Sequence, residues 1–478
     1  MHVAFVDREP IAKLGILYLA GALRRAGHTA ELFIATLEKD LPGAVRRSGA
    51  GLIAFSATTP EHGWALRTAK TLKEAARVPT ILGGPHASFA PRVVEEAALD
   101  YAARGDCEAA IVDLASALEA GEDASRIPNL WTIRDGARVE NPLRPLEQDL
   151  DRLAHPDRSL LAKYPHLAYF LEQAPAITVR GCPYECTFCF NKAYWEMYGA
   201  DPRDYVRRRS PEDAVAELAE LKRRWGTRGI KFVDDTFNLA PEWFEKWAPL
   251  YRKEVGLPYN ARIRADWMTD DLARRMKEAG PVSLSFGIEA SDEESRNGNL
   301  KKALADDAID ACAAILRRRK IPFQTFNIIG LPGETFEQAV GTLRRNIRLK
   351  PNHAWCSIMQ VYPETGVAAR ALEMGLLPEG FDFKEVKTGF FDRSYLRMGR
   401  SREIENLHKL FNTTVMFPFL LPLVLLLARL PPNALFRLVF KLAYAVGSFR
   451  MGKIDLRDVL VLGRSVRLYF SRQEEEAY

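Results

Sequence analysis

The chain has 478 residues, which is too many for one ordinary hydrophobic core, so two or three domains are expected. Its 47% hydrophobic and 27% charged residues exclude a disordered or fibrous protein, and a mild net charge of +5 gives no reason to expect a nucleic-acid partner. The six cysteines do not have the spacing of a disulfide framework, and no signal peptide is visible, so we expect a reducing, cytoplasmic location.

Residues 1–125 alternate short apolar segments with helical patterns. Strands that alternate with helices indicate an α/β domain with a doubly wound parallel sheet, covered on both faces. The strands are expected at 3–6, 30–34, 52–55 and 80–82. Such sheets bind ligands beyond the carboxyl ends of their strands. The segments expected there, rich in glycine and small hydroxyl residues, are 7–14, 56–60, 83–88 and 104–108.

Residues 126–175 contain six prolines and no sustained hydrophobic period. Proline interrupts helices and the interior strands of sheets. We therefore expect this segment to be a linker between two domains.

A second alternating series covers residues 176–370. Its six strands are expected at 176–179, 230–233, 260–263, 282–286, 323–329 and 357–361. Six β/α units predict a partial (β/α)6 barrel, open on one side, with its chemistry at the carboxyl ends of the strands. Residues 371–478 have mostly helical patterns and are expected to form a helical C-terminal domain.

The longest apolar segment, 415–428, is interrupted by two prolines and is too short to span a bilayer. Two interpretations stay open. The segment belongs to a buried helix pair, or it forms an interfacial or hydrophobic-substrate surface with peripheral membrane contact through 415–450. A buried helix pair is the ordinary interpretation of such a segment. The reason for keeping the second interpretation is the set of basic residues that flank and interrupt the apolar residues, namely Arg429, Arg437, Lys441 and Arg450.

Three cysteines, Cys182, Cys186 and Cys189, directly follow the first expected barrel strand. Thiolates at these spacings can converge on one metal centre, and cysteine thiolates hold iron–sulfur clusters. A four-iron cluster normally takes four such ligands; because no fourth cysteine is near, one iron would stay open for another ligand. A structural zinc ion would need a fourth protein ligand, and the nearest histidine, His166, lies upstream across a strand.

This Cys-x3-Cys-x2-Cys loop resembles the hallmark of the radical S-adenosylmethionine superfamily. The resemblance implies a 4Fe–4S cluster on the three cysteines, whose open iron chelates S-adenosylmethionine and whose reduction yields a 5′-deoxyadenosyl radical. Further segments at the ends of the expected strands extend the match over residues 176–366. The residues that the resemblance assigns to S-adenosylmethionine are Phe188, Asp234, Asp235, Arg264, Gly287, Glu289, Ser291 and Gly330. No residue is assigned as a catalytic acid or base.

Residues 1–125 resemble the cobalamin-binding domain that precedes the barrel in one large subgroup of this superfamily. The residues that the resemblance assigns to cobalamin are Leu14, Gly15, Ser56, Thr58, Thr59, Gly83, Gly84, His86, Gly105 and Glu108. Cys107 stands where the family usually has glycine. The motif Asp-x-His-x-x-Gly, which supplies a histidine to cobalt, is absent, so His86 is interpreted as a loop or corrin-edge residue. A nucleotide-binding domain for another cofactor remains an alternative, because the Gly83-Gly84 pair is a weak motif.

Together these resemblances imply a cobalamin-dependent radical S-adenosylmethionine enzyme, similar to the class B methyltransferases. The commonest reaction of the subgroup methylates an unactivated carbon of a small molecule through the deoxyadenosyl radical and methylcobalamin. Two alternatives stay open: ring closure, ring contraction or oxidation without methyl transfer, and a non-catalytic cobalamin or cluster sensor. An external electron donor of the flavodoxin or ferredoxin type is expected as a partner.

Overall fold

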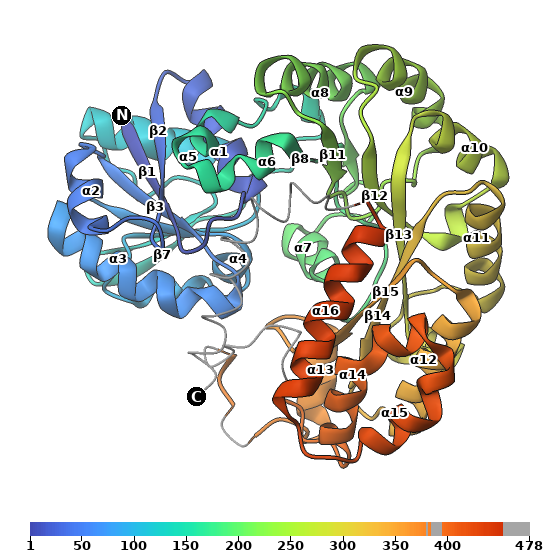
Figure 1. Ribbon diagram of the computed structural model, residues 1–478. Helices are drawn as coiled ribbons and strands as arrows, with labels where there is room; N and C mark the ends of the chain where they lie inside the picture. Colours follow the sequence, from blue (N-terminus) through green and yellow to red (C-terminus); the bar gives the residue numbers. More distant parts are fainter. Residues whose placement is uncertain (379–380, 384–393, 453–478) are drawn as a thin grey trace. The chain divides into compact units, whose positions relative to one another are not determined.

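The computed structural model describes residues 1–378, 381–383 and 394–452, and the chain folds as two compact units. Unit 1 consists mainly of Met1–Glu172, and unit 2 consists mainly of Gln173–Phe381 and the described part of 388–460. Both units are built from helices and mostly parallel strands (Figure 1), as the sequence predicts. None of the described helices is long and apolar enough to cross a membrane.

Unit 1 contains a seven-stranded sheet in the order β2-β1-β3-β4-β5-β6-β7, of which the first five strands are parallel. Strands β1 to β5 are His2–Asp7, Thr29–Ile34, Leu52–Ser56, Thr80–Gly83 and Tyr101–Ala103. Helices α1 to α5 are Leu14–Arg25, Leu41–Arg47, His62–Ala76, Pro85–Phe89 and Glu108–Ala120. Buried side chains such as Phe33, Ile53 and Leu82 fill the core of this unit. The strand order reverses between β1 and β3, which is where doubly wound sheets bind ligands.

The segment 126–175, expected to be a linker, contains a hairpin that extends the sheet of unit 1. Strands β6 (Leu130–Arg134) and β7 (Ala137–Glu140) form an antiparallel hairpin that pairs with β5. The turn places Asp135 at φ 51° and Gly136 at φ 77°. An Asp-Gly pair strongly favours a hairpin turn. Our prediction of a linker gave more weight to the prolines of this segment and was wrong. A short helix, α6 (Tyr169–Glu172), ends the unit.

Unit 2 contains a six-stranded parallel sheet in the order β15-β14-β13-β12-β11-β8, a partial barrel with β15 and β8 as its edge strands. Its strands are β8 (Gln173–Ala176), β11 (Gly229–Phe232), β12 (Tyr259–Ile263), β13 (Pro281–Glu289), β14 (Phe323–Ile329) and β15 (His353–Ile358). The outer helices (Figure 1) are α8 (Pro211–Trp225), α9 (Pro241–Glu254), α10 (Asp270–Glu278), α11 (Asp306–Arg318) and α12 (Phe336–Leu349). Side chains such as Phe232, Trp247 and Tyr259 form the core of this unit.

The first strand of unit 2 lies earlier in the sequence than expected. Strand β8 ends at Ala176, because Asp234 Oδ1 accepts the N–H groups of Thr178 at 2.8 Å and Val179 at 2.7 Å and turns the chain out of the sheet. Val179–Arg180 then forms β9, which pairs with β10 (Arg207–Arg208) in a separate two-stranded sheet. Strand β15 likewise precedes its expected position.

The C-terminal helices belong to unit 2 and do not form the separate domain that we expected. Helices α14 (Ser401–Met416), α15 (Leu421–Leu427) and α16 (Ala434–Arg450) share a buried apolar cluster with α12 and β15. Asn412 on α14 accepts the N–H of Ala354 at 3.1 Å, and His408 Nε2 lies 2.9 Å from the Cys356 carbonyl oxygen. A buried edge strand needs partners for its backbone groups, and α14 provides them to β15. The remainder of the expected domain, 453–478, lies outside the described residues.

Candidate active site and cofactor-binding residues

The three cysteines lie on the loop between β9 and helix α7 (Phe190–Tyr198), so the cysteine loop follows the carboxyl end of β8. Cys186 is buried, Cys182 and Cys189 are partly buried, and none of the three forms a disulfide. Burial raises the pKa of each thiol, to about 12 for Cys189. Such thiols keep their protons until a metal displaces them.

Within the described residues, no three His, Cys, Asp or Glu side chains are spaced to hold a single metal ion. A 4Fe–4S cluster requires a different ligand geometry. Each thiolate binds a different iron atom, so the three sulfur atoms lie further apart than the ligands of a single metal ion do. Three free, sheltered thiols on one short loop fit a cluster and not a mononuclear zinc site.

The start of the cysteine loop is fixed by its backbone and by β11. Gly181 has φ 93°, and a Cβ there would lie 2.7 Å from the carbonyl oxygen of Tyr205, so this position requires glycine. Thr236, which follows β11, places its Oγ1 3.6 Å from Cys182 Sγ. The loop is therefore held in place by contacts that do not involve a metal.

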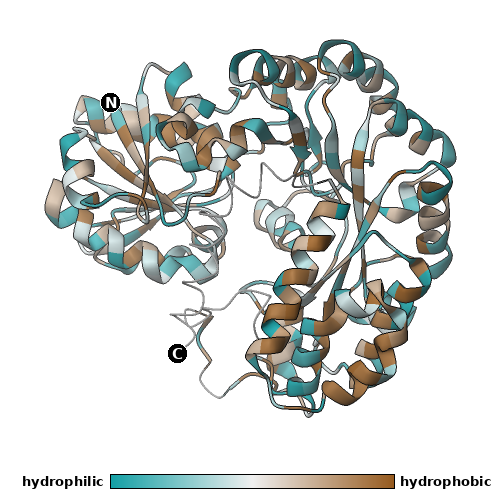
Figure 2. Cartoon of the chain, viewed as in Figure 1, coloured by the Kyte–Doolittle hydropathy of each residue, from teal (hydrophilic) through white to brown (hydrophobic). Residues whose placement is uncertain are grey.

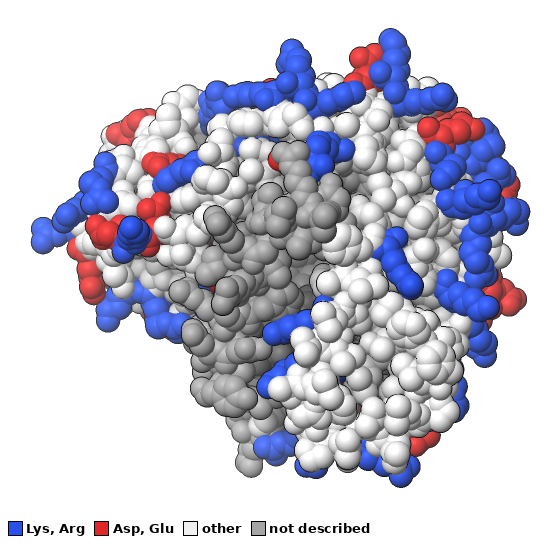
Figure 3. Space-filling view, in the orientation of Figure 1, with Lys and Arg blue, Asp and Glu red and all other residues white. Residues whose placement is uncertain are grey.

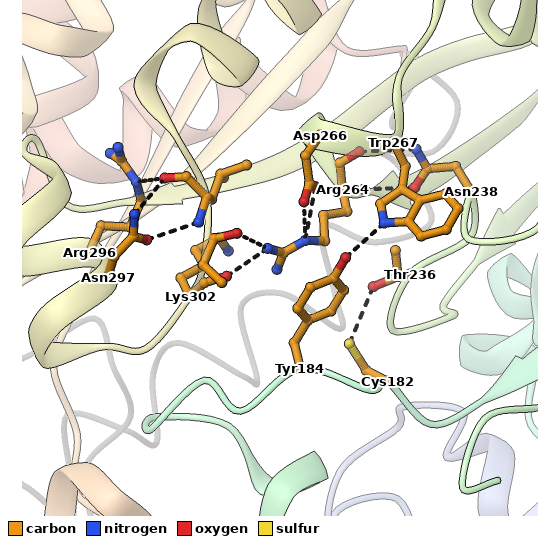
Figure 4. A network of polar contacts seen from close by, with 12 residues as sticks. Cys182, Tyr184, Thr236, Asn238, Arg264, Asp266, Trp267, Arg296, Asn297 and Lys302 are labelled. Atoms are coloured by element: carbon orange, nitrogen blue, oxygen red, sulfur yellow. Dashed lines mark hydrogen bonds and ion pairs between the residues drawn. The ribbon is translucent and has the colours of Figure 1, made fainter. Parts of the chain in front are cut away.

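Arg264 fixes the middle of the same loop (Figure 4). Its guanidinium carbon lies 3.3 Å from the centre of the Tyr184 ring, and its Nη2 donates to the carbonyl oxygens of Lys302 at 2.6 Å and Ala303 at 2.7 Å. Asp266 accepts from its Nε at 3.1 Å. Arg264, predicted to contact S-adenosylmethionine, thus joins the cysteine loop to the segment after β13.

The end of the loop is tied to that segment as well. Thr187 donates its N–H to the Leu300 carbonyl oxygen and its hydroxyl to the Asn299 carbonyl oxygen, each at 3.0 Å. The N–H of Val367, on helix α13 (Gly366–Glu373), donates to the Thr187 carbonyl oxygen at 2.9 Å. Three parts of the barrel therefore converge on the cysteine loop.

Glu289 and Lys302 form a buried ion pair beside the loop. Glu289 Oε1 lies 2.7 Å from Lys302 Nζ, and this ammonium group lies 5.9 Å from the centre of the Phe188 ring. Strand β13 has an irregularity between Gly287 and Glu289, and Glu289 has φ 65°. A Cβ on Gly287 would lie 1.9 Å from Glu289 Oε1 and 2.6 Å from Lys302 Nζ. The predicted Gly-x-Glu segment therefore has a steric reason: the glycine leaves room for the ion pair.

A cavity of about 660 Å³ opens inside the barrel next to this pair. Two of the predicted S-adenosylmethionine residues, Phe188 and Glu289, line it. Arg262 also lines it, on the strand where the family resemblance places a basic residue for the cofactor. The other polar lining residues were not predicted, and they include Lys231, Asn260, Ser285, Gln324, Asn327, Trp355, Ser357 and Gln360. The sequence did contain a signal, because polar residues alternate along strands that a parallel sheet usually makes apolar on both faces. In a barrel, that alternation marks the inner face.

The remaining predicted S-adenosylmethionine residues do not line the cavity. Asp234 is fully buried and accepts from Thr178 and Val179, while Asp235 interacts with the Asn191 side chain and the N–H of Gly181. These two acids hold the cysteine loop and α7, and their assignment to S-adenosylmethionine stays a prediction.

Ser291 and Gly330 also make contacts within the protein. The hydroxyl of Ser291 donates to Asp292 at 3.1 Å and lies 3.4 Å from the Gln338 carbonyl oxygen, on α12. The N–H of Gly330, at φ 78°, donates to the Glu334 carboxylate. Both residues shape the segments after β13 and β14, and their contact with S-adenosylmethionine stays a prediction.

In unit 1 the predicted cobalamin residues gather where β1, β3, β4 and β5 end. The residues are Leu14 and Gly15 at the start of α1, Ser56 at the end of β3, Thr58 and Thr59 before α3, Gly83 and Gly84 between β4 and α4, His86 in α4, Gly105 after β5, and Glu108 at the start of α5. Gly15 is exposed, with no atom within 4 Å of the position its Cβ would take. Gly84 has φ 89°, and a Cβ there would lie 2.9 Å from the N and O atoms of Ala57. An open surface and two closely packed loops at a strand-order reversal fit a large planar cofactor.

Two further groups at these strand ends were not predicted. Lys13 Nζ lies 3.0 Å from Asp7 Oδ1, Glu61 Oε1 and the Ser56 carbonyl oxygen, so its three protons join the loops after β1 and β3. Burial raises the pKa of Asp7 to about 6. No local pattern pairs Lys13 with Glu61, which lies 48 residues away.

His62 is the second group. Its ring stacks on His86 with centroids 4.1 Å apart, and both rings are buried. His86 Nδ1 lies 3.4 Å from Thr59 Oγ1. His86 thus packs against His62 and Thr59. Its interpretation as a loop or corrin-edge residue stays a prediction.

Two family models match the chain. Residues 5–115 match the B12 binding domain, and residues 176–345 match the Radical SAM superfamily. Together the two matches cover more than half of the chain. The protein belongs to the cobalamin-binding radical S-adenosylmethionine family, and its cofactors are a 4Fe–4S cluster, S-adenosylmethionine and cobalamin.

Individual proteins agree with this assignment. The chain is 28% identical to an uncharacterized methyltransferase of Pyrococcus horikoshii, over 76% of this chain and 79% of that protein. It is 27% identical to the anaerobic magnesium-protoporphyrin IX monomethyl ester cyclase of Rubrivivax gelatinosus, over 77% and 67%. The radical S-adenosylmethionine methyltransferase TsrM from Kitasatospora setae, with a tryptophan substrate bound, shares the fold with a TM-score of 0.66 at 18% identity, over 78% and 76%.

Proposed function

We propose that this cobalamin-dependent radical enzyme methylates an unactivated carbon atom of a small molecule. The observation that carries the proposal is the presence of both cofactor-binding units in one chain whose relatives include a protein named as a methyltransferase over most of its length. When bound, the cluster and S-adenosylmethionine supply a carbon-centred radical, and cobalamin supplies a methyl group. The residues of the chain bind and orient these groups and the substrate.

The barrel supplies the means to orient a substrate. Phe188 and Glu289 line the cavity, and Lys302 Nζ lies 2.7 Å from Glu289 Oε1, so we propose that S-adenosylmethionine binds at this end of it. Beyond them, the inner face offers the cations Lys231 and Arg262 and a set of neutral hydrogen-bonding side chains. We propose that the substrate presents polar or anionic groups to this face while an apolar carbon points toward Phe188.

A second candidate function is radical ring closure without methyl transfer. A relative named as a cyclase covers a similar share of the chain at nearly the same identity. The two reactions differ in how they consume S-adenosylmethionine. Methyl transfer uses one molecule as a methyl donor and another as a radical source, whereas ring closure needs the radical alone.

The test is anaerobic reconstitution of the full chain with iron, sulfide and cobalamin, followed by turnover with methyl-deuterated S-adenosylmethionine. A flavodoxin or ferredoxin, which we propose as the natural type of donor, supplies electrons, and the substrate source is a metabolite extract of cells that lack the gene. We expect S-adenosylhomocysteine and 5′-deoxyadenosine in comparable amounts, and one extracted compound that gains a deuterated methyl group. Deoxyadenosine with little S-adenosylhomocysteine and no deuterium transfer would overturn the proposal in favour of ring closure.

A further inference from the structure

One part of unit 2 carries an unusual number of exposed apolar side chains. Ten of the fifteen large apolar side chains that are exposed in the described residues lie between 417 and 449. They are Phe417, Phe419, Leu423, Leu426, Leu430, Leu435, Leu438, Leu442, Val446 and Phe449. Figure 2 shows the corresponding helices, α15 and α16, as largely hydrophobic. Scattered exposed leucines are ordinary, but a continuous group of this size marks an interaction site.

The exposed stripe of α16 is separate from the face that packs on the barrel. The packed face contributes Phe436, Ala443 and Gly447, and a Cβ on Gly447 would lie 2.3 Å from the His353 ring. The exposed apolar residues recur three or four positions apart and form a second stripe along the helix, through Leu435 and Leu442. Leu435 is 63% exposed and Leu442 is 59% exposed. Packing of unit 2 does not require this second stripe.

The charge around these residues has one sign. Residues 406–452 contain no Asp or Glu, and their Lys and Arg residues are Lys409, Arg429, Arg437, Lys441 and Arg450. Arg429, Arg437 and Arg450 are exposed, and no acidic side chain of the described residues pairs with them. Figure 3 shows this part of the surface as a largely uncharged area. An apolar stripe edged by cations alone matches the boundary between the headgroups and acyl chains of an anionic membrane.

The same charge pattern disfavours a second copy of the chain as the partner. In a two-fold dimer through this surface, each copy presents the same patch to the other. The cations of one copy would then meet the cations of its partner, with no carboxylate between 406 and 452 to compensate.

We propose that residues 417–450 form a membrane-docking surface for a leaflet that contains anionic lipid. Helix α16 lies in the plane of the interface, its exposed stripe enters the acyl-chain boundary, and Arg429, Arg437 and Arg450 contact headgroup phosphates. The proposal concerns where the enzyme works and is independent of whether it transfers a methyl group.

The experiment is flotation of the full-length protein with phosphatidylcholine vesicles, with and without phosphatidylglycerol. We expect binding that requires phosphatidylglycerol and weakens with added salt, because the headgroup attraction is screened. The double variant Leu435→Ser with Leu442→Ser should bind at least tenfold more weakly, because it loses the two apolar side chains that would be transferred from water into the membrane on binding. Arg429→Gln and Arg437→Gln should each weaken binding about fivefold. Leu372→Ser is the matched control, because Leu372 is 53% exposed on α13, outside the surface, and its loss should change nothing.

Three results would overturn the proposal. The first is that the unaltered protein floats with neither vesicle. The second is that the double leucine variant floats as well as the unaltered protein. The third is a concentration-dependent dimer, seen by analytical ultracentrifugation, that the double variant abolishes while vesicle binding is absent, which would make a second copy the true occupant. All of the substituted side chains are exposed, so circular dichroism should show an unchanged fold for each variant.

Discussion

The guanidinium group of Arg264 is stacked on the ring of Tyr184, with its central carbon 3.3 Å from the ring centre. Tyr184 lies between Cys182 and Cys186, so the contact acts directly on the cysteine loop. The same guanidinium binds the Lys302 carbonyl oxygen, and the Lys302 ammonium binds Glu289. One arginine thus links the cysteine loop to the ion pair, of which Glu289 lines the cavity.

Arg264→Ala should therefore loosen the cysteine loop. We expect less iron after reconstitution, an altered paramagnetic resonance signal from the reduced cluster, and a free energy of unfolding lower by about 1–3 kcal/mol, because the buried carbonyl group of Lys302 loses its donor. Arg264→Lys should not restore the signal, since an ammonium group cannot both stack on the ring and serve the two carbonyls. Arg262→Ala is the comparison, because Arg262 lines the cavity face that we propose for the substrate: iron content should persist while conversion of the substrate falls. Equal iron loss in both variants would contradict this division of roles.

The cysteine ligands give the most direct prediction. Alanine at Cys182, Cys186 or Cys189 should remove the cluster, because each change deletes one of only three thiolates on the loop. Iron and sulfide analysis after anaerobic reconstitution measures the outcome. Alanine at Cys312 or Cys356, both buried apart from the loop, should leave the iron content unchanged. Full iron loading of the triple variant would show that the cluster lies elsewhere.

Gly287 should be needed for binding of S-adenosylmethionine more than for folding. An alanine Cβ would lie 1.9 Å from Glu289 Oε1 and 2.6 Å from Lys302 Nζ, so both charged groups would have to move from the positions in which they form the ion pair. We expect Gly287→Ala to remain folded and to bind S-adenosylmethionine about tenfold more weakly, a loss of about 1.4 kcal/mol, as measured by equilibrium dialysis of the iron-loaded protein. Gly298→Ala is the matched control, because no atom lies within 4 Å of its Cβ position. An unchanged affinity in Gly287→Ala would show that the Glu289–Lys302 pair does not contact the cofactor.

Glu334 should make stability depend on pH. Burial raises its pKa from 4.5 to about 8, although the N–H groups of Gly330 and Leu331 donate to it. Because the folded state holds this proton more tightly than the unfolded state, stability is full below pH 4.5 and falls as pH rises toward 8. The contribution to the slope is at most about 1.4 kcal/mol for each pH unit. Glu334→Gln keeps an acceptor oxygen and should flatten urea-unfolding stability over this window, and equal slopes in both proteins would refute the assignment.

The sequence by itself determined the features that are local in the chain. The three cysteines lie within eight residues, so the cysteine loop was visible in the sequence. The alternation of strands and helices follows from short-range hydrophobic periods, so the two α/β units were predictable. The loop residues for cobalamin were likewise expected at strand ends, because every parallel sheet exposes its loops there. The hairpin at 130–140 could also have been predicted, because its Asp-Gly turn is present in the sequence, but we expected a linker there.

Only the tertiary structure decided which side chains meet. Arg262 and Arg264 are two residues apart, and an uninterrupted strand would point both into the barrel. Strand β12 ends at Ile263, where Asn238 Oδ1 accepts the N–H of Arg264 at 2.8 Å, so the second arginine turns to Tyr184 while the first lines the cavity. The partners in such cases come from distant segments, as Lys302 does for Arg264 and Glu61 does for Lys13. Contacts between such segments follow from packing and not from local sequence, which is why composition, period and spacing could not reveal them.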